Sequence, residues 1–190
     1  MSVLVAAYNE SAAIRDTLES LSRQDYPGSV EVLVLNDGSS DDTVRLARAA
    51  IKKHGFKRKI KARVIDFEVN RGKSAALNDG LVEAKYDLIV TLDGDSWVKY
   101  DGLRKIVERL LSDPPDTQAV AGAVMVRNSR QNFLCRAQEW DYFHGIASVK
   151  RMQGMYHGTL VAQGAFSIYR REALEQAGGW AECVGEDIVL

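Results

Sequence analysis

The residues Leu88-Ile-Val-Thr-Leu92 form a mainly apolar run that ends in Asp93-Gly-Asp95. A short run of this kind, bounded by turn residues, predicts a strand over residues 87–92. In an open parallel α/β sheet, ligands bind beyond the carboxyl ends of the strands. The two carboxylates therefore follow the strand at the position where such a sheet would bind a ligand.

Strands and helices are predicted to alternate on both sides of this run. The other early strands are expected at residues 1–7, 30–35, 61–67 and 119–126, and helices are expected between the strands at 11–23, 42–54, 73–84 and 101–111. Strands separated by helices of this length predict an α/β fold, with a Rossmann-like, mostly parallel sheet and helices on both faces. Beyond Arg130 the pattern predicts a long helix to about residue 150, a strand at 166–169 and a short helix from Arg171.

Length and composition indicate a single globular domain over residues 1–190. The chain has 190 residues, 46% hydrophobic and 27% charged, which is ordinary for a folded enzyme and unlike a disordered protein. A formal net charge of −1 provides no global attraction to nucleic acid. The two cysteines, Cys135 and Cys183, lack the spacing of a metal site and are expected to be reduced.

The segment 133–150 is rich in aromatic residues, including Trp140, Tyr142 and Phe143. We expect these side chains to pack in the core under the sheet. The alternative is a surface that contacts membrane helices outside these 190 residues.

Asp93 and Asp95 suit a hard divalent cation. Two carboxylates separated by one glycine can bind Mg²⁺ or Mn²⁺, and the cation would bridge diphosphate oxygens and neutralise charge on a departing phosphate. Asp-x-Asp by itself is also a common structural turn. Its position at the end of a buried strand favours the metal interpretation.

Two further loops carry polar residues with two possible roles each. Asp37 lies in an Asn-Asp-Gly turn, where it either stabilises the turn or accepts a hydrogen bond from a uracil N–H. Lys73 follows Gly72 at a predicted helix start, where it is either a surface lysine or a ligand for phosphate or base.

Six motifs in order resemble those of the family 2 glycosyltransferases, in particular the processive synthases of chitin, hyaluronan, cellulose and poly-N-acetylglucosamine. They are Ala7-Tyr-Asn-Glu10, Asn36-Asp-Gly-Ser-Ser-Asp41, Asn70-Arg-Gly-Lys-Ser-Ala-Ala-Leu-Asn78, Asp93-Gly-Asp95, Gln163-Gly-Ala165 and Gly185-Glu-Asp187. The resemblance covers the whole chain. It implies a GT-A fold, a UDP-sugar donor, Mg²⁺ or Mn²⁺ as cofactor, and inversion at the anomeric carbon.

The resemblance also implies a role for each matching residue. Donor binding is assigned to Tyr8, Glu10, Asp37, Lys73 and Asp93, metal coordination to Asp95, and acceptor binding to Gln163, Gly164 and Ala165. Asp187 matches the general base, and Glu186 supports it. Inverting transfer needs a carboxylate opposite the leaving phosphate to take the proton of the attacking hydroxyl. The alternative role of Glu186-Asp187 is a helix cap.

The predicted function is inverting transfer of a sugar, with N-acetylglucosamine favoured over glucose, from a UDP-sugar to a growing glycan. The alternatives are a nucleotide-sugar-binding module or an inactive relative without transfer activity, and a nucleotidyltransferase. Residues 1–126 are expected to form the nucleotide-sugar-binding half and residues 127–190 the acceptor-side half.

The chain is expected to be a truncated part of a longer protein. The processive relatives carry a Gln-x-x-Arg-Trp motif downstream of the base, and these 190 residues lack it. Membrane helices of the parent are expected to flank the domain, which would lie on the cytoplasmic side of the plasma membrane. The isolated chain is expected to have little activity.

Overall fold

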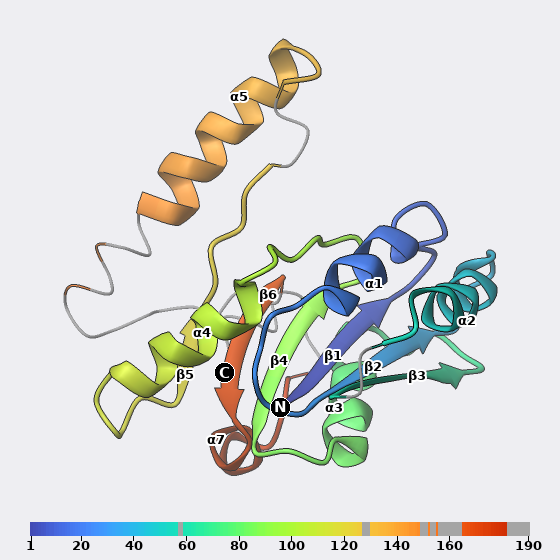
Figure 1. Ribbon diagram of the computed structural model, residues 1–190, viewed down its shortest axis with the longest axis horizontal. Helices are drawn as coiled ribbons and strands as arrows, with labels where there is room; N and C mark the ends of the chain where they lie inside the picture. Colours follow the sequence, from blue (N-terminus) through green and yellow to red (C-terminus); the bar gives the residue numbers. More distant parts are fainter. Residues whose placement is uncertain (57–58, 127–129, 149–151, 153–154, 156–164, 182–190) are drawn as a thin grey trace.

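The computed structural model describes residues 1–56, 59–126, 130–148, 152, 155 and 165–181. Its centre is a six-stranded sheet with the order β3-β2-β1-β4-β6-β5 (Figure 1). The strands are β1 (Ser2–Ala7), β2 (Val30–Asp37), β3 (Ile60–Phe67), β4 (Leu88–Asp93), β5 (Ala119–Ala121) and β6 (Phe166–Arg170). The first four strands are parallel, and β6 pairs antiparallel with both β4 and β5. The predicted fold class, an α/β fold with a mostly parallel sheet, is confirmed.

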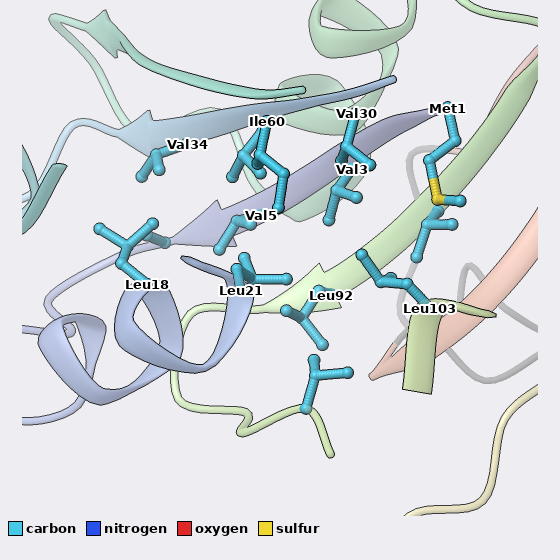
Figure 2. Close-up of a cluster of buried hydrophobic side chains, with 14 of the residues drawn as sticks. Met1, Val3, Val5, Leu18, Leu21, Val30, Val34, Ile60, Leu92 and Leu103 are labelled. Carbon is cyan, nitrogen blue, oxygen red and sulfur yellow. The ribbon is translucent and has the colours of Figure 1, made fainter. Parts of the chain in front are cut away.

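Helices cover both faces of the sheet. The covering helices are α1 (Ile14–Ser22), α2 (Thr43–His54), α3 (Lys73–Glu83), α4 (Gly102–Ser112) and α7 (Arg171–Ala177), and a further helix, α5 (Phe133–Tyr142), buries none of its residues. Side chains of β1 alternate between the faces, because successive residues of a strand point to opposite sides. Val3 and Val5 join the core under α1, α2 and α4, whereas Leu4 joins the core under α3 and α7. Figure 2 shows the first of these cores, with Val5 of β1 next to Leu21 of α1.

The sequence predicted most element bounds to within a few residues, with one clear error. The strand expected at 119–126 is only Ala119–Ala121. Among the described residues it pairs only with β6, at the edge of the sheet, and its own residues are half-buried. The long helix expected after Arg130 is α5 followed by a π-helical segment at Phe143–Ser148.

The expectation that the aromatic segment packs under the sheet is wrong. Helix α5 has no buried residue, and Trp140 is 70% exposed. Figure 1 shows α5 standing away from the sheet. Phe133 and Leu134, at its start, are also exposed. Within the described residues, no helix is both long and apolar enough to span a bilayer.

Helix α4 offers a matched test of the core. Leu110 is fully buried against the sheet, whereas its neighbour Leu111 is 65% exposed. Leu110→Ala should lower the free energy of unfolding by about 2–5 kcal/mol, because it removes buried methyl groups and leaves a cavity. Leu111→Ala should change it by less than about 0.5 kcal/mol. Urea unfolding of both variants measures the difference, and equal losses would contradict this packing.

Candidate functional site

Four loops meet at the carboxyl edge of the parallel strands. The register pairs Ala7 of β1 with Asn36 of β2, and Ala6 of β1 with Asp93 of β4. The loops that follow these strands therefore start side by side. The sequence prediction that polar residues from separate loops converge at this edge is confirmed for the loops after β1, β2, β3 and β4.

The loops after β1 and β2 are bonded to each other. Asn9 has a left-handed backbone (φ 56°), which Asn tolerates better than most residues. Its N–H donates to Ser39 Oγ at 2.9 Å, and its Oδ1 accepts from the Ser40 N–H at 2.9 Å. Tyr8, one residue earlier, remains 50% exposed beside this pair of loops.

Asp41 completes the connection between these two loops. Its Oδ2 accepts from the Ser11 N–H at 3.1 Å, and its Oδ1 accepts from the Thr43 N–H at 3.0 Å. The hydrogen bond from the Thr43 hydroxyl is the main cause that lowers the pKa of Asp41 to about 2. The Thr43 Oγ1 also accepts from the Glu10 N–H at 2.8 Å. Sequence reasoning assigned no ligand-binding or catalytic role to Asn9 or Asp41, although both lie within the quoted motifs.

Asp37 is buried (4% exposed) and holds the loop after β3. Its Oδ1 accepts from the Arg71 N–H at 2.9 Å, and its Oδ2 accepts from the Gly72 N–H at 2.8 Å. The carboxylate therefore accepts its hydrogen bonds from the neighbouring loop. The alternative role predicted from the sequence, stabilisation of its own turn, would have required a bond within that turn. Gly38 allows this approach, since a Cβ there would lie 2.5 Å from the backbone nitrogen of Asn70.

Lys73 begins α3 and pairs with Asp93 at the end of β4. The Nζ of Lys73 lies 2.8 Å from Asp93 Oδ1, and both side chains are about one-third exposed (32% and 33%). The sequence left two roles for Lys73, a surface lysine or a ligand for phosphate or base, and this partly buried pair favours the second. The ammonium lies at the carboxyl edge of the sheet, where it could contact an anionic ligand.

Gly94 brings Asp93 and Asp95 close to the end of β1. Its N–H donates to Ala6 O at 2.8 Å, and its carbonyl accepts from Thr17 Oγ1 at 2.7 Å. A Cβ on Gly94 would lie 3.0 Å from Ala6 O and 3.1 Å from Glu10 Cγ, so a side chain there would be crowded. Glycine therefore fits this close approach without a shift of its neighbours.

Glu10, Asp93 and Asp95 form an acidic group at this edge. Burial is the main cause that raises the pKa of Glu10, and the charges of Asp95, Asp93 and Asp41 raise it further. Asp95 itself is exposed. No set of three His, Cys, Asp or Glu side chains among the described residues is arranged to hold a metal by itself.

This arrangement fits a cation of the Mg²⁺ type. Mg²⁺ usually keeps several waters and is held by one or two carboxylates together with substrate phosphates. A site with the single exposed carboxylate of Asp95, open to solvent, matches that donor set. Asp95, with Glu10 nearby, would hold the cation.

Of the residues predicted for the acceptor side and the base, the structure describes only Ala165. Ala165 is half-buried in a turn before β6, and its carbonyl accepts from the Asp93 N–H at 3.4 Å. Ala165 therefore lies next to the Asp93-Gly-Asp95 turn. Gln163, Gly164, Glu186 and Asp187 lie outside the described residues.

Solved structures with similar folds are glycosyltransferases. A mannosyltransferase from Pyrobaculum calidifontis, in complex with GDP-Man and Mn²⁺, aligns with a TM-score of 0.73 and 26% identity over 99% of this chain and 49% of its own. Glucosyl-3-phosphoglycerate synthase from Mycobacterium tuberculosis, in complex with Mn²⁺, UDP and phosphoglyceric acid, aligns with a TM-score of 0.56 and 25% identity, over 91% of this chain and 56% of its own. The chain therefore has the GT-A glycosyltransferase fold, as the resemblance implied.

The family follows from the sequence comparison. Residues 2–178 match the model of glycosyl transferase family 2, and the chain belongs to that family. It is 34% identical to the poly-beta-1,6-N-acetyl-D-glucosamine synthase of Staphylococcus epidermidis over its whole length, which is 44% of that relative. The synthase of the same name from Staphylococcus aureus strain COL is 32% identical over 98% of this chain and 43% of its own length. The chain thus spans less than half the length of these relatives.

The low pKa of Asp41 predicts how the stability of the site depends on pH. A carboxyl whose folded pKa is about 2, against an ordinary 3.8, stabilises the fold above about pH 4, and this contribution is lost as pH falls through 2. Asp41→Asn should therefore lower the Tm at pH 7. The difference in Tm between this variant and the wild type should shrink toward zero as the pH falls from 4 to 2.

The matched control for this prediction is Asp42→Asn. Asp42 pairs with Arg45 of its own helix, and the Asn9 and Asp41 bonds between the two loops do not involve it. Thermal unfolding at several pH values should show a smaller Tm change for Asp42→Asn. Equal changes for both variants, or an Asp41→Asn difference independent of pH, would contradict the role given to Asp41.

Proposed function

We propose that this chain is the catalytic domain of an inverting glycosyltransferase that moves N-acetylglucosamine from UDP-N-acetylglucosamine to a growing polysaccharide. The observation that carries the proposal is the meeting of Asp37, Lys73, Asp93, Asp95 and Glu10 at one edge of a GT-A sheet. Membership of glycosyl transferase family 2 supports the reaction class. The relatives named poly-beta-1,6-N-acetyl-D-glucosamine synthase support the choice of sugar.

Asp37 would bind the uracil. A carboxylate has about four lone-pair sites, and the N–H groups of Arg71 and Gly72 use two of them. The remaining capacity can accept from the N–H of the base, in a carboxylate that is already fixed in position. The half-exposed ring of Tyr8 is suited to pack against the base or ribose.

Lys73, Asp93, Glu10 and Asp95 would bind the diphosphate and sugar. The ammonium of Lys73 can donate to a phosphate oxygen while it stays close to Asp93. Asp95, near Glu10, would hold Mg²⁺ or Mn²⁺, which when bound would offset charge on the departing diphosphate. Asp93 would accept hydrogen bonds from the sugar or nucleotide.

The transfer step needs an acceptor hydroxyl and a base. The hydroxyl oxygen bonds to the anomeric carbon as the bond from that carbon to the diphosphate oxygen breaks, and the configuration inverts. The hydroxyl proton passes to the carboxylate of Asp187, which Glu186 supports, and UDP leaves. Gln163, Gly164 and Ala165 would line the acceptor position, so residues 127–190 contribute the acceptor side and residues 1–126 the donor side.

We propose that the chain belongs to a longer membrane protein and lies on the cytoplasmic side of the plasma membrane. The exposed apolar residues of α5, including Phe133 and Trp140, would contact membrane helices of the parent. A nucleotide-sugar-binding module without turnover remains the alternative function. Turnover by the parent protein with a panel of donors, including UDP-N-acetylglucosamine, UDP-glucose and GDP-mannose, separates the two.

Asp95 provides the test of the metal site. UDP should bind the parent protein more tightly with Mn²⁺ or Mg²⁺ than with EDTA, and Asp95→Ala should remove most of this difference. Asp116→Ala is the control, because Asp116 precedes β5 at the opposite edge of the sheet and is exposed. Calorimetry that finds the same UDP affinity with metal and with EDTA would contradict the assignment.

Asp187 provides the test of the reaction. Asp187→Asn should leave UDP-sugar binding nearly intact, since the proposed base contacts the acceptor. Loss of a general base should lower the rate of glycan synthesis by about 10²–10⁴-fold. Glu186→Gln should lower it less. A near-normal rate for Asp187→Asn in the parent protein would refute the base assignment.

A further inference from the structure

Asn78 of α3 holds the backbone of Trp180 with two hydrogen bonds. Its Nδ2 donates to the Trp180 carbonyl at 2.9 Å, and its Oδ1 accepts from the Trp180 N–H at 2.8 Å. The side-chain amide thus satisfies both backbone polar groups of one residue that is 102 positions away in the chain. A reciprocal pair fixes orientation as well as position, because both bonds must keep their geometry.

The backbone before Trp180 is built for this contact. Gly178 and Gly179 both have left-handed φ angles, of 81° and 83°, which favour glycine. The Gly179 N–H donates to Leu174 O at 2.8 Å and so ends α7. A Cβ on Gly179 would lie 2.4 Å from Asn78 Oδ1. Any other residue at 179 would therefore push the amide away.

Packing holds the Trp180 side chain in the same place. Trp180 is 2% exposed and meets the Tyr169 ring edge-on, with 5.8 Å between the ring centroids. Its Nε1 is buried without a hydrogen-bond partner among the described residues. The buried ring and its contact with Tyr169 thus help to fix Trp180 beside α3.

Helix α3 thereby connects two parts of the molecule. Its first residue, Lys73, pairs with Asp93, and the Gly72 N–H before it donates to Asp37. Gly80 packs so closely on β2 that a Cβ there would lie 2.5 Å from Leu35 Cδ1. The helix is therefore fixed on the sheet between the proposed donor site and Trp180.

Trp180 precedes Asp187 by seven residues in the sequence. We propose that Asn78 is a positioning residue: by fixing Trp180 on the donor-site helix, it sets the point from which the chain continues to the base. This inference rests on the proposed function, because it takes Asp187 as the base. Among the described residues, the hydrogen bonds of the Asn78 side chain go to the backbone of Trp180, which is outside the proposed donor residues, so its effect on the base would pass through Trp180.

The test compares transfer with hydrolysis of UDP-N-acetylglucosamine by the complete parent protein. In hydrolysis, water replaces the acceptor hydroxyl at the anomeric carbon and can pass its proton to solvent. Both reactions therefore need the donor site, but only transfer needs an acceptor hydroxyl aligned with the base. Asn78→Ala should leave the Kd of UDP within about twofold and lower kcat for transfer at least about tenfold, since small misplacements of reacting groups have large effects on rate. The ratio of hydrolysis to transfer should rise.

Gly179→Ala provides an independent route to the same defect. It should reproduce the changed ratio, and the double variant should be no worse than either single one, because both changes break the same contact. Arg171→Ala is the control. The Arg171 guanidinium also ties α7 to α3, by donating to Leu81 O and Ala84 O, but it does not touch Trp180. It should lower the Tm and leave the ratio unchanged.

The outcomes separate this inference from the proposed function. If Asn78→Ala lowers transfer, hydrolysis and UDP binding together, its role is only structural and the inference is overturned. An unchanged ratio of hydrolysis to transfer in Asn78→Ala also overturns the inference. If the unmodified parent protein transfers the sugar, the proposed function still stands. A wild-type parent that binds UDP but neither transfers nor hydrolyses the sugar refutes the proposed function, and the role of Asn78 with it.

Discussion

The parallel pairing of β1 with β2 and β4 is the constraint on which the rest of the site depends. It sets Ala7 beside Asn36 and Ala6 beside Asp93, so that three chain segments turn away from the sheet at the same level. The turn at Asp93-Gly94-Asp95 then passes so close to the end of β1 that only glycine fits without crowding. The carboxylates that we assign to donor and metal binding owe their proximity to this register, and a shift of one residue would turn their side chains to the other face.

The polar residues at this edge divide into two groups by what they contact. Asn9, Asp37 and Asp41 bond to the backbone of a neighbouring loop and hold the loops in a fixed arrangement. Tyr8 and Asp95 remain exposed, and Glu10, Lys73 and Asp93 are partly exposed, so these side chains are open to a ligand. Asp37 can take both roles, because its two backbone bonds leave lone pairs unused. Loops that are fixed before binding lose less conformational entropy when the ligand arrives.

The sequence predicted the fold class, most elements and the convergence of the four loops, because hydrophobic periodicity and the positions of Gly and Asp are local signals. It did not predict that β6 runs antiparallel between β4 and β5, since strand pairing depends on residues far apart in the chain. The aromatic residues of α5 were wrongly expected in the core, because composition does not say which surface a helix meets. The pair between Asn78 and Trp180 has no signal in a single sequence, since its partners are 102 residues apart.

The most direct test of the central claim, that the carboxyl edge of this sheet is a metal-dependent UDP-sugar site, is a crystal structure of the parent protein with UDP-N-acetylglucosamine and Mn²⁺. Anomalous scattering from manganese locates the metal directly in that crystal. The account predicts a manganese peak beside Asp95, the diphosphate near Lys73, and the uracil N–H bonded to Asp37. Nucleotide bound elsewhere, or a manganese peak distant from Asp95, would contradict it.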